Sequence, residues 1–330
     1  MINCVARPAT QYSQWRPIIV TANNLTQSEQ AFFVQTHSLK ADGLLIIVTL
    51  LAAISWMFSK EALAEFPPLL FVGSRFLLAG LILALVGYRS LKSLSRQQWQ
   101  GSLLVGTVFG AAMCFWIMGL FTTRSLGEGA FITSMAVVLV APMGLMFFKE
   151  QVTPSTWVAL PLAILGMALL ALRQGFQPES SQLFFLTAAL LFSLTFILNG
   201  KAAAKTPALA LSAIQLCIVG LVALPISALS EDWPQHVSHS MLHWLLLSVV
   251  VGTAARFLLQ TYAQGLTSPA HAAVIMVLEP IWTASIAAYW FAERMEAQQL
   301  AGCALIFASL IANRWSAVRA LLSRFSPQKS

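Results

Sequence analysis

The sequence predicts an all-α integral membrane protein in which ten transmembrane helices form two inverted five-helix repeats. Three observations predict this fold class: an apolar composition, a succession of apolar runs long enough to cross a bilayer, and an internal repeat. Of the 330 residues, 58% are hydrophobic and only 9% are charged, and the mean hydropathy is +0.76. Soluble domains carry about 25% charged residues. The composition therefore indicates a polytopic membrane protein.

Residues 1–41 are polar and irregular in pattern, and their apolar stretches, such as Pro17-Ile18-Ile19-Val20, are too short to cross a membrane. No charged segment leads into an apolar core, as a secretory signal requires. We therefore expect a cytoplasmic N-terminal tail without regular structure. A start site assigned too far upstream is the alternative, so whether residues 1–40 belong to the native protein is left open.

Ten apolar runs separated by short polar breaks follow this tail. A helix of about 20 residues, rising about 1.5 Å per residue, crosses the roughly 30 Å hydrocarbon core. On that basis we expect spans near residues 42–59, 68–88, 100–121, 127–148, 155–172, 182–200, 207–229, 242–264, 271–291 and 297–314. The first five would form one repeat, residues 42–173, and the last five a second repeat, residues 181–315.

The two halves of the chain can be aligned with each other. Placing Phe148-Lys149-Glu150 on Phe291-Ala292-Glu293 also places Ile132 on Ile275. Because each half has an odd number of spans, the two copies would lie in opposite orientations in the bilayer. Inverted repeats around a site at the bilayer midplane are a recurrent architecture of transporters.

Lysine and arginine in the connections set the orientation, because they concentrate on the cytoplasmic side. With the N-terminus inside, most of them fall on the inner side, and only Lys60, Arg124, Arg173 and Arg294 fall outside. Both termini are therefore predicted to be cytoplasmic, and residues 316–330 form a basic tail that anionic lipids would attract. The net charge of +7 is scattered over short loops, so no nucleic-acid partner is expected.

Five segments of the chain form a recognisable series. They are Pro67-Pro68-Leu69-Leu70-Phe71, Ser74-Arg75-Phe76-Leu77-Leu78-Ala79, Phe131 to Leu139, Leu278-Glu279-Pro280 and Phe291-Ala292-Glu293-Arg294. In their order and spacing they resemble the EamA-type transporters of the drug/metabolite transporter superfamily. The resemblance covers roughly residues 42 to 315. It implies ten helices around a central cavity, a multi-pass location in the bacterial inner membrane, and export or exchange of small metabolites such as amino acids.

Glu279 and Pro280 interrupt the ninth expected span. A charged residue at mid-span costs roughly 2.5 to 3.5 kcal/mol on insertion scales, so Glu279 is expected to face protein or water and is a functional candidate. Pro280 lacks an N–H group and frees a backbone carbonyl in the preceding turn, which makes it a gating or tethering candidate.

Arg256 and Glu279 lie at about the same depth on either side of the loop near residues 265–270, so an ion pair between them is available. Glu279 could carry a proton, or Arg256 could bind an anionic group of a substrate. A permanent ion pair between two helices is the structural alternative. Gln260 follows Arg256 by one turn and shares its face, whereas Tyr262 does not share it cleanly; both are further candidates.

Trp116 and Trp282 lie on spans that, by the resemblance, line the cavity, and each has polar or small neighbours. Such rings could contact an apolar part of a substrate. Packing within the protein or contact with lipid is the alternative for both.

Arg75 lies in the second span near its outer end. It could close an outer gate against Glu61 or Glu65, tether helices, or extend to the membrane surface. Lys60 and Lys201 end the first span of each half and are gating candidates, with a simpler role as interfacial anchors.

The sequence lacks a Walker A phosphate loop and an HExxH zinc motif. His236, His239 and His243 would be too far apart along a helix to share one ion, and no cysteine completes a site. We expect no metal, no cofactor and no enzymatic activity. A secondary active transporter is the leading hypothesis, with a proton and a second copy of the chain kept open as partners. A passive facilitator or exchanger of the same fold, and a membrane-embedded enzyme, are the alternatives.

Overall fold

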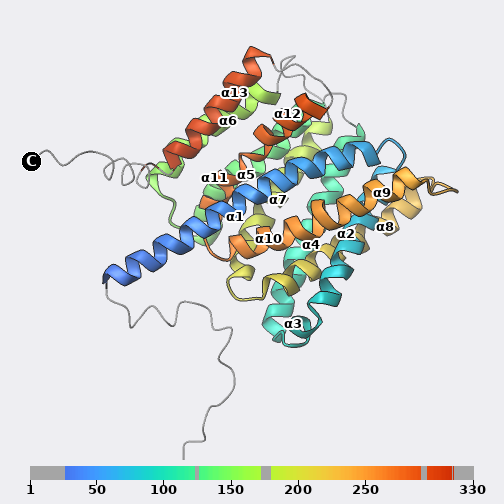
Figure 1. The fold of residues 1–330 in the computed structure, drawn as a ribbon, viewed down its shortest axis with the longest axis horizontal. Helices are drawn as coiled ribbons and strands as arrows, with labels where there is room; N and C mark the ends of the chain where they lie inside the picture. The colour runs from blue at the N-terminus through green and yellow to red at the C-terminus, as the bar shows by residue number, and fades with distance from the viewer. Residues whose placement is uncertain (1–26, 123–125, 172–179, 291–295, 314, 316–330) are drawn as a thin grey trace, which may run out of the picture.

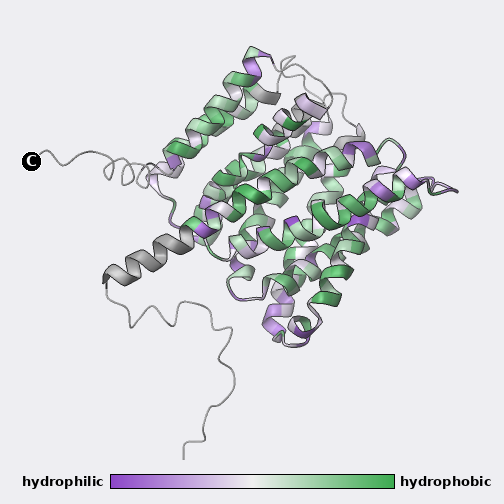
Figure 2. Ribbon diagram, in the orientation of Figure 1, coloured by the Kyte–Doolittle hydropathy of each residue, from purple (hydrophilic) through white to green (hydrophobic). Residues whose placement is uncertain are grey.

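The computed structural model describes residues 27–122, 126–171, 180–290, 296–313 and 315, and every regular element in these ranges is a helix. The helices form one bundle, in which α6 and α13 lie on one side, α2 and α8 on the other, and α1 and α7 between them (Figure 1). Apolar residues cover the helices along their lengths, and polar residues gather at the helix ends (Figure 2). The prediction of an all-helical membrane protein is confirmed.

The described part of the first half contains six helices. They are α1 (Gln27–Ala62), α2 (Pro68–Val86), the short α3 (Tyr88–Lys92), α4 (Arg96–Thr122), α5 (Leu126–Phe148) and α6 (Pro154–Ala171). The second half begins with α7 (Ser181–Ala203) and α8 (Ala208–Ser230). It continues through α9 (His239–Leu247), the π-helix η3 (Ser248–Ala255), α10 (Arg256–Gln264), α11 (Pro269–Met276), α12 (Glu279–Trp290) and α13 (Ala297–Asn313).

Six segments in the described ranges are long and apolar enough to cross a membrane. They lie within α1, α2, α4, α7 and α8 and along the continuous run from α9 through α10. Three apolar helices are shorter by the same measure: Ile132–Phe148, Pro154–Leu169 and Ala297–Asn313. The expected count of ten spans is therefore not confirmed by length and composition.

The beginning of the chain differs from the expectation. Residues 27–41 continue α1 as a helix, so the prediction of an irregular tail was wrong for this part. No proline or glycine lies between Gln27 and Asp42 to stop the helix. Residues 1–26 and 316–330, to which the other tail predictions apply, lie outside the described residues, as do the outer basic residues Arg124, Arg173 and Arg294.

Helix packing repeats when the two halves are exchanged. The second spans of the halves, α2 and α8, pack on each other, and so do the fifth, α6 and α13. The third span of each half packs on the first span of the other half: α4 packs on α7, and the run η3–α10 packs on α1. The fourth spans follow the same rule: α5 packs on α7, and α11 and α12 pack on α1. This pattern is what two copies of one five-helix unit produce, and it supports the predicted repeat.

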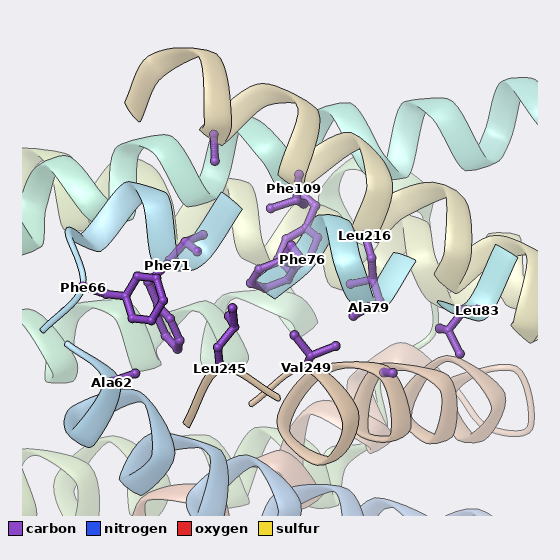
Figure 3. Close-up of a cluster of buried hydrophobic side chains, with 14 of the residues drawn as sticks. Ala62, Phe66, Phe71, Phe76, Ala79, Leu83, Phe109, Leu216, Leu245 and Val249 are labelled. Carbon is purple, nitrogen blue, oxygen red and sulfur yellow. The ribbon is translucent and has the colours of Figure 1, made fainter. Parts of the chain in front are cut away.

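A cluster of aromatic and aliphatic side chains holds the two halves together on the α2 and α8 side (Figure 3). Phe76 of α2 meets Phe109 of α4 edge to face, with ring centroids 5.7 Å apart. Leu216 of α8 and Val249 of η3 close the cluster from the second half. Such aromatic pairs add to the packing free energy beyond the area that they bury.

Glu231 immediately follows α8 and caps the start of α2. Its carboxylate accepts hydrogen bonds from the backbone N–H groups of Leu69 and Leu70, both at 2.8 Å. The Ser227 hydroxyl donates a third bond at 2.7 Å. The first N–H groups of a helix have no partner within the helix and carry partial positive charge, so an external carboxylate stabilises them.

Replacing Glu231 by alanine is expected to lower the free energy of unfolding by about 1–2 kcal/mol, the usual effect of losing a helix cap. Asp232 is exposed and is the matched control; Asp232→Ala should change stability by less than about 0.5 kcal/mol. Unfolding of the purified protein in SDS, followed by circular dichroism, measures both. Equal effects of the two substitutions would contradict the assigned cap.

Candidate functional site

Two neighbouring stretches of the second half depart from regular α-helix. The first is η3, a π-helical stretch that ends where α10 begins, at Arg256. The Thr253 hydroxyl donates to the backbone carbonyl of Ser248 at 2.8 Å and stabilises the widened turns. A side chain at Gly252 would collide with Ser55 of α1, so glycine permits the close approach of these helices. π-helical insertions in α-helices are frequent at functional sites.

The second irregular stretch is the break between α11 and α12. Pro280 has no N–H group, so the carbonyl of Met276 loses its helical partner. The chain tightens instead, with Val277 donating to Val274 and Leu278 donating to Ile275 at 3.2 and 3.0 Å. The disturbance expected from Pro280 is therefore present.

This break places Glu279 in the first turn of α12. The N-terminus of a helix carries partial positive charge, which favours an ionised carboxylate at this position. The backbone geometry thus offsets part of the cost of holding Glu279 inside an apolar bundle.

Arg256 and Glu279 form the ion pair that their equal depth in adjacent spans made available. Arg256 Nη2 lies 3.4 Å from Glu279 Oε2, and the side chains are 19% and 21% exposed. The indole N–H of Trp56 donates to the other carboxylate oxygen at 3.1 Å. Glu279 therefore joins α1, α10 and α12. A single contact of 3.4 Å is long for an ion pair, so the two groups are loosely rather than bidentately paired.

Other sequence-predicted candidates surround this pair. Trp116 of α4 packs edge-on against Trp56, with ring centroids 6.3 Å apart. Gln260 lies one turn after Arg256, and Trp282 lies one turn after Glu279. Three buried polar atoms here have no hydrogen-bond partner among the described residues: Arg256 Nε, Gln260 Oε1 and Trp282 Nε1. Buried polar groups are normally paired, so these two donors and one acceptor are available for hydrogen bonds to water or a ligand.

Tyr262 does not join this group. Its side chain is 41% exposed, and its hydroxyl accepts a hydrogen bond from Lys40 of α1 at 3.2 Å. The structure thus places Tyr262 beside Lys40, one and a half turns beyond Arg256 on α10, rather than at the ion pair.

Arg75 is buried, with 7% of its surface exposed, and binds neutral groups. Its Nε donates to the Thr253 hydroxyl at 2.5 Å, Nη1 to the Ser59 hydroxyl at 2.7 Å and Nη2 to the Ser55 hydroxyl at 2.7 Å. A second bond from Nη2 reaches the carbonyl of Gly252 at 3.2 Å. These bonds join α2 to both α1 and η3.

Two interpretations of Arg75 were therefore wrong. The side chain does not extend to the membrane surface, because it is directed inward to these hydroxyl groups. It also does not pair with the outer acids. Glu61 accepts a hydrogen bond from Trp290 Nε1 at 3.2 Å, and Glu65 accepts one from the Ser238 hydroxyl. The remaining interpretation, a tether between helices, describes the contacts.

Lys201 ends α7 and pairs with Glu150, which follows α5, at 3.3 Å. Its ammonium group also lies 3.9 Å from the centre of the Phe148 ring. Lys60, its counterpart in the first half, is exposed in the last turn of α1. The pair of Lys201 and Glu150 connects the ends of α5 and α7 at one face of the bundle.

Sequence reasoning did not predict the contacts of two polar groups. Asn199, Gln215 and Gln264, with Thr261, form a buried hydrogen-bonded group between α7, α8 and α10. The second group, around His271 and Asp42, lies where α1 and α11 meet. Polar residues inside apolar runs were the available signal. Within the described ranges, no three His, Cys, Asp or Glu side chains are placed to hold a metal ion.

Comparison with known proteins agrees with this architecture. The model of the EamA-like transporter family matches residues 39–172 and 180–315. An uncharacterized transporter of Archaeoglobus fulgidus is 24% identical over 182 residues, which are 55% of this chain and 64%, less than two thirds, of that protein. A protein crystal structure superposes with a TM-score of 0.71 at 15% identity and covers 87% of this chain and 99% of its own. That likeness concerns the fold alone.

Proposed function

The chain belongs to the EamA-like transporter family, whose model matches both of its halves, and on this premise we propose that it is a secondary active exporter of small metabolites such as amino acids or related compounds. Family membership supports a multi-pass membrane transporter, and the absence of enzymatic activity is part of the proposal. The cargo, the direction of transport and its coupling to a proton are parts of the proposal.

Ten membrane-crossing helices are part of the same proposal. Four further segments bring the six long spans to ten. They are α5 with 23 residues, α6 with 18, α13 with 17 and the interrupted pair α11–α12. Helices of about 17 to 25 residues suffice to cross a bilayer. Residues 42–173 and 181–315 then form two inverted repeats, with both termini in the cytoplasm of a bacterial cell and the bundle in its inner membrane.

The observation that carries the proposal is the ion pair of Arg256 and Glu279 between two irregular helices. Interrupted helices near the bilayer midplane are where secondary transporters bind substrates and ions. Protonation of Glu279 would remove its charge and release Arg256, which could then bind an anionic group of the substrate. Gln260 and Trp282 would supply the remaining polar contacts, because each has an unpaired buried atom.

Alternating access would follow from rocking of the two halves about this site. The pair of Lys201 and Glu150 would hold one end of the bundle closed, and Lys60 lies at the corresponding place of the other half. Arg75 would keep α1, α2 and η3 moving as one body, because its hydrogen bonds join all three.

The test compares metabolites inside and outside cells that overproduce the wild type, Glu279→Gln or neither, with matched amounts of inserted protein. We expect the wild type to move a small set of metabolites outward and Glu279→Gln to reduce that export at least tenfold, because glutamine cannot exchange a proton. Equal export by both proteins would remove Glu279 from the mechanism but leave the exporter in place. No change with the wild type would contradict export.

A further inference from the structure

A second polar group lies away from the pair of Arg256 and Glu279, where α11 begins and α13 ends, beside Asp42 within α1. His271 Nε2 lies 2.8 Å from Asp42 Oδ1. On the other side of the ring, Asn313 Nδ2 lies 3.2 Å from His271 Nδ1. The Thr156 hydroxyl, buried at the start of α6, donates to Asn313 Oδ1 at 2.9 Å and lies 3.0 Å from the exposed Thr153 hydroxyl.

These contacts define the protonation of the ring. Since the Thr156 hydroxyl donates to the amide oxygen of Asn313, the amide nitrogen faces the imidazole. An amide N–H can only donate, so His271 Nδ1 must accept and carries no proton. The proton is then on Nε2, where it is donated to Asp42. In this arrangement both ring nitrogens are hydrogen-bonded, Nε2 to Asp42 and Nδ1 to Asn313.

The same residues also provide partners for the protonated ring. A proton from water would add to the Nδ1 lone pair, which gives an imidazolium beside the Asp42 carboxylate. If the Asn313 amide turns over, its oxygen accepts from Nδ1–H and its nitrogen donates to the Thr156 hydroxyl. The Thr156 hydroxyl can then donate to Thr153 instead. Every member therefore keeps a hydrogen-bond partner in both states.

We propose that His271 is a proton-binding site of this protein, separate from Glu279, whose protonation state is transmitted through Asn313 to Thr156. The group crosses the boundary between the repeats, because Asp42 and Thr156 belong to the first half and His271 and Asn313 to the second. Separation of the halves at this end must break it. In the proposed orientation this is the cytoplasmic end, so cytoplasmic pH would adjust its opening.

Two charged groups of the described residues near this end are engaged elsewhere. On α1, Lys40 bonds to the Tyr262 hydroxyl of α10, and on α7, Lys201 pairs with Glu150. The described parts of α6 and α13 carry no charged residue. Asp42 is the carboxylate in contact with the ring, with Oδ1 2.8 Å from Nε2. Ser268, which caps α11, accepts a hydrogen bond from the backbone N–H of His271 at 3.3 Å, so this bond does not involve the ring.

The experiment measures the titration of each histidine in the full-length protein in detergent, from the pH dependence of C2–H exchange followed by mass spectrometry. Asp42→Asn is expected to lower the titration midpoint of His271 relative to the wild type, because the neighbouring charge is lost. Thr156→Val keeps the shape of the side chain but has no hydroxyl to accept a hydrogen bond from the turned Asn313 amide. It should therefore also lower the titration midpoint of His271. Thr156→Ser, which retains the hydroxyl, should match the wild type.

His236 and His243 are exposed and serve as internal controls whose midpoints should not move. Unchanged control midpoints and gel-filtration profiles identify variants that remain folded. A His271 midpoint that is the same in Asp42→Asn as in the wild type would overturn the proposal, as would identical behaviour of Thr156→Val and Thr156→Ser. The readout needs no substrate, so it stands or fails independently of the proposed export.

Discussion

Replacement of Gly220 by leucine is expected to abolish recovery of folded protein, because this position has no room for a side chain. A Cβ at Gly220 would lie 2.5 Å from the Cβ of Leu77 and 2.6 Å from its backbone nitrogen. Across the same interface, a Cβ at Gly80 would lie 2.6 Å from the backbone nitrogen of Cys217. The two helices, α2 and α8, form the contact between equivalent spans of the halves, so neither can move away without separating the repeats.

Small residues let membrane helices approach closely, and packing then replaces the hydrophobic effect as the source of stability. Gly220→Ala should cost about 1–3 kcal/mol, and the larger leucine more. Gly101→Leu is the matched control, because nothing lies within 4 Å of a Cβ there. The monodisperse fraction in gel filtration after extraction into detergent measures both. Equal recovery of Gly220→Leu and Gly101→Leu would show that α2 and α8 do not pack this closely.

The helices could be predicted from sequence because an apolar run of sufficient length is itself the physical cause of a membrane helix. The expected span 68–88 ends at Val86, and the span 100–121 begins earlier, at Arg96. Irregular backbone was predictable only where one residue type enforces it. Pro280 indicated the break between α11 and α12, whereas no residue of Ser248–Ala255 signals a π-helix.

Contacts in the candidate site were predictable where the charge of two side chains and their depth in the bilayer determine the pairing. Arg256 and Glu279 are at the same depth in adjacent spans, and they pair. For Arg75 the same reasoning offered an acidic partner, but the side chain instead donates to hydroxyl groups of two other helices. The proximity of His271 and Asp42 depends on how α1 packs on α11. Contacts of that kind are set by the fold and not by the local sequence.

Arg256→Met is expected to destabilise the protein by about 2 kcal/mol, because it leaves the Glu279 carboxylate without its counter-charge. Losing one partner of a fully buried pair costs more, but these side chains are about one-fifth exposed and partly screened. Glu279→Met should have a similar effect, since it leaves Arg256 unpaired. The double variant Arg256→Met/Glu279→Met removes both charges and should regain most of the lost stability. Unfolding in SDS measures all three.

Transport by the same variants separates a structural ion pair from a functional one. If the pair only holds α10 and α12 together, the double variant should regain export together with stability. We expect instead that it regains stability while export stays at least tenfold below the wild type, because methionine can neither exchange a proton nor bind an anion. The pair of Lys201 and Glu150 is the control: it is more exposed, with the lysine at 40%, so its double variant should change stability by less than about 1 kcal/mol. A double variant of Arg256 and Glu279 that exports at the wild-type rate would assign the charges to helix packing and move the search for the coupling group elsewhere in the bundle.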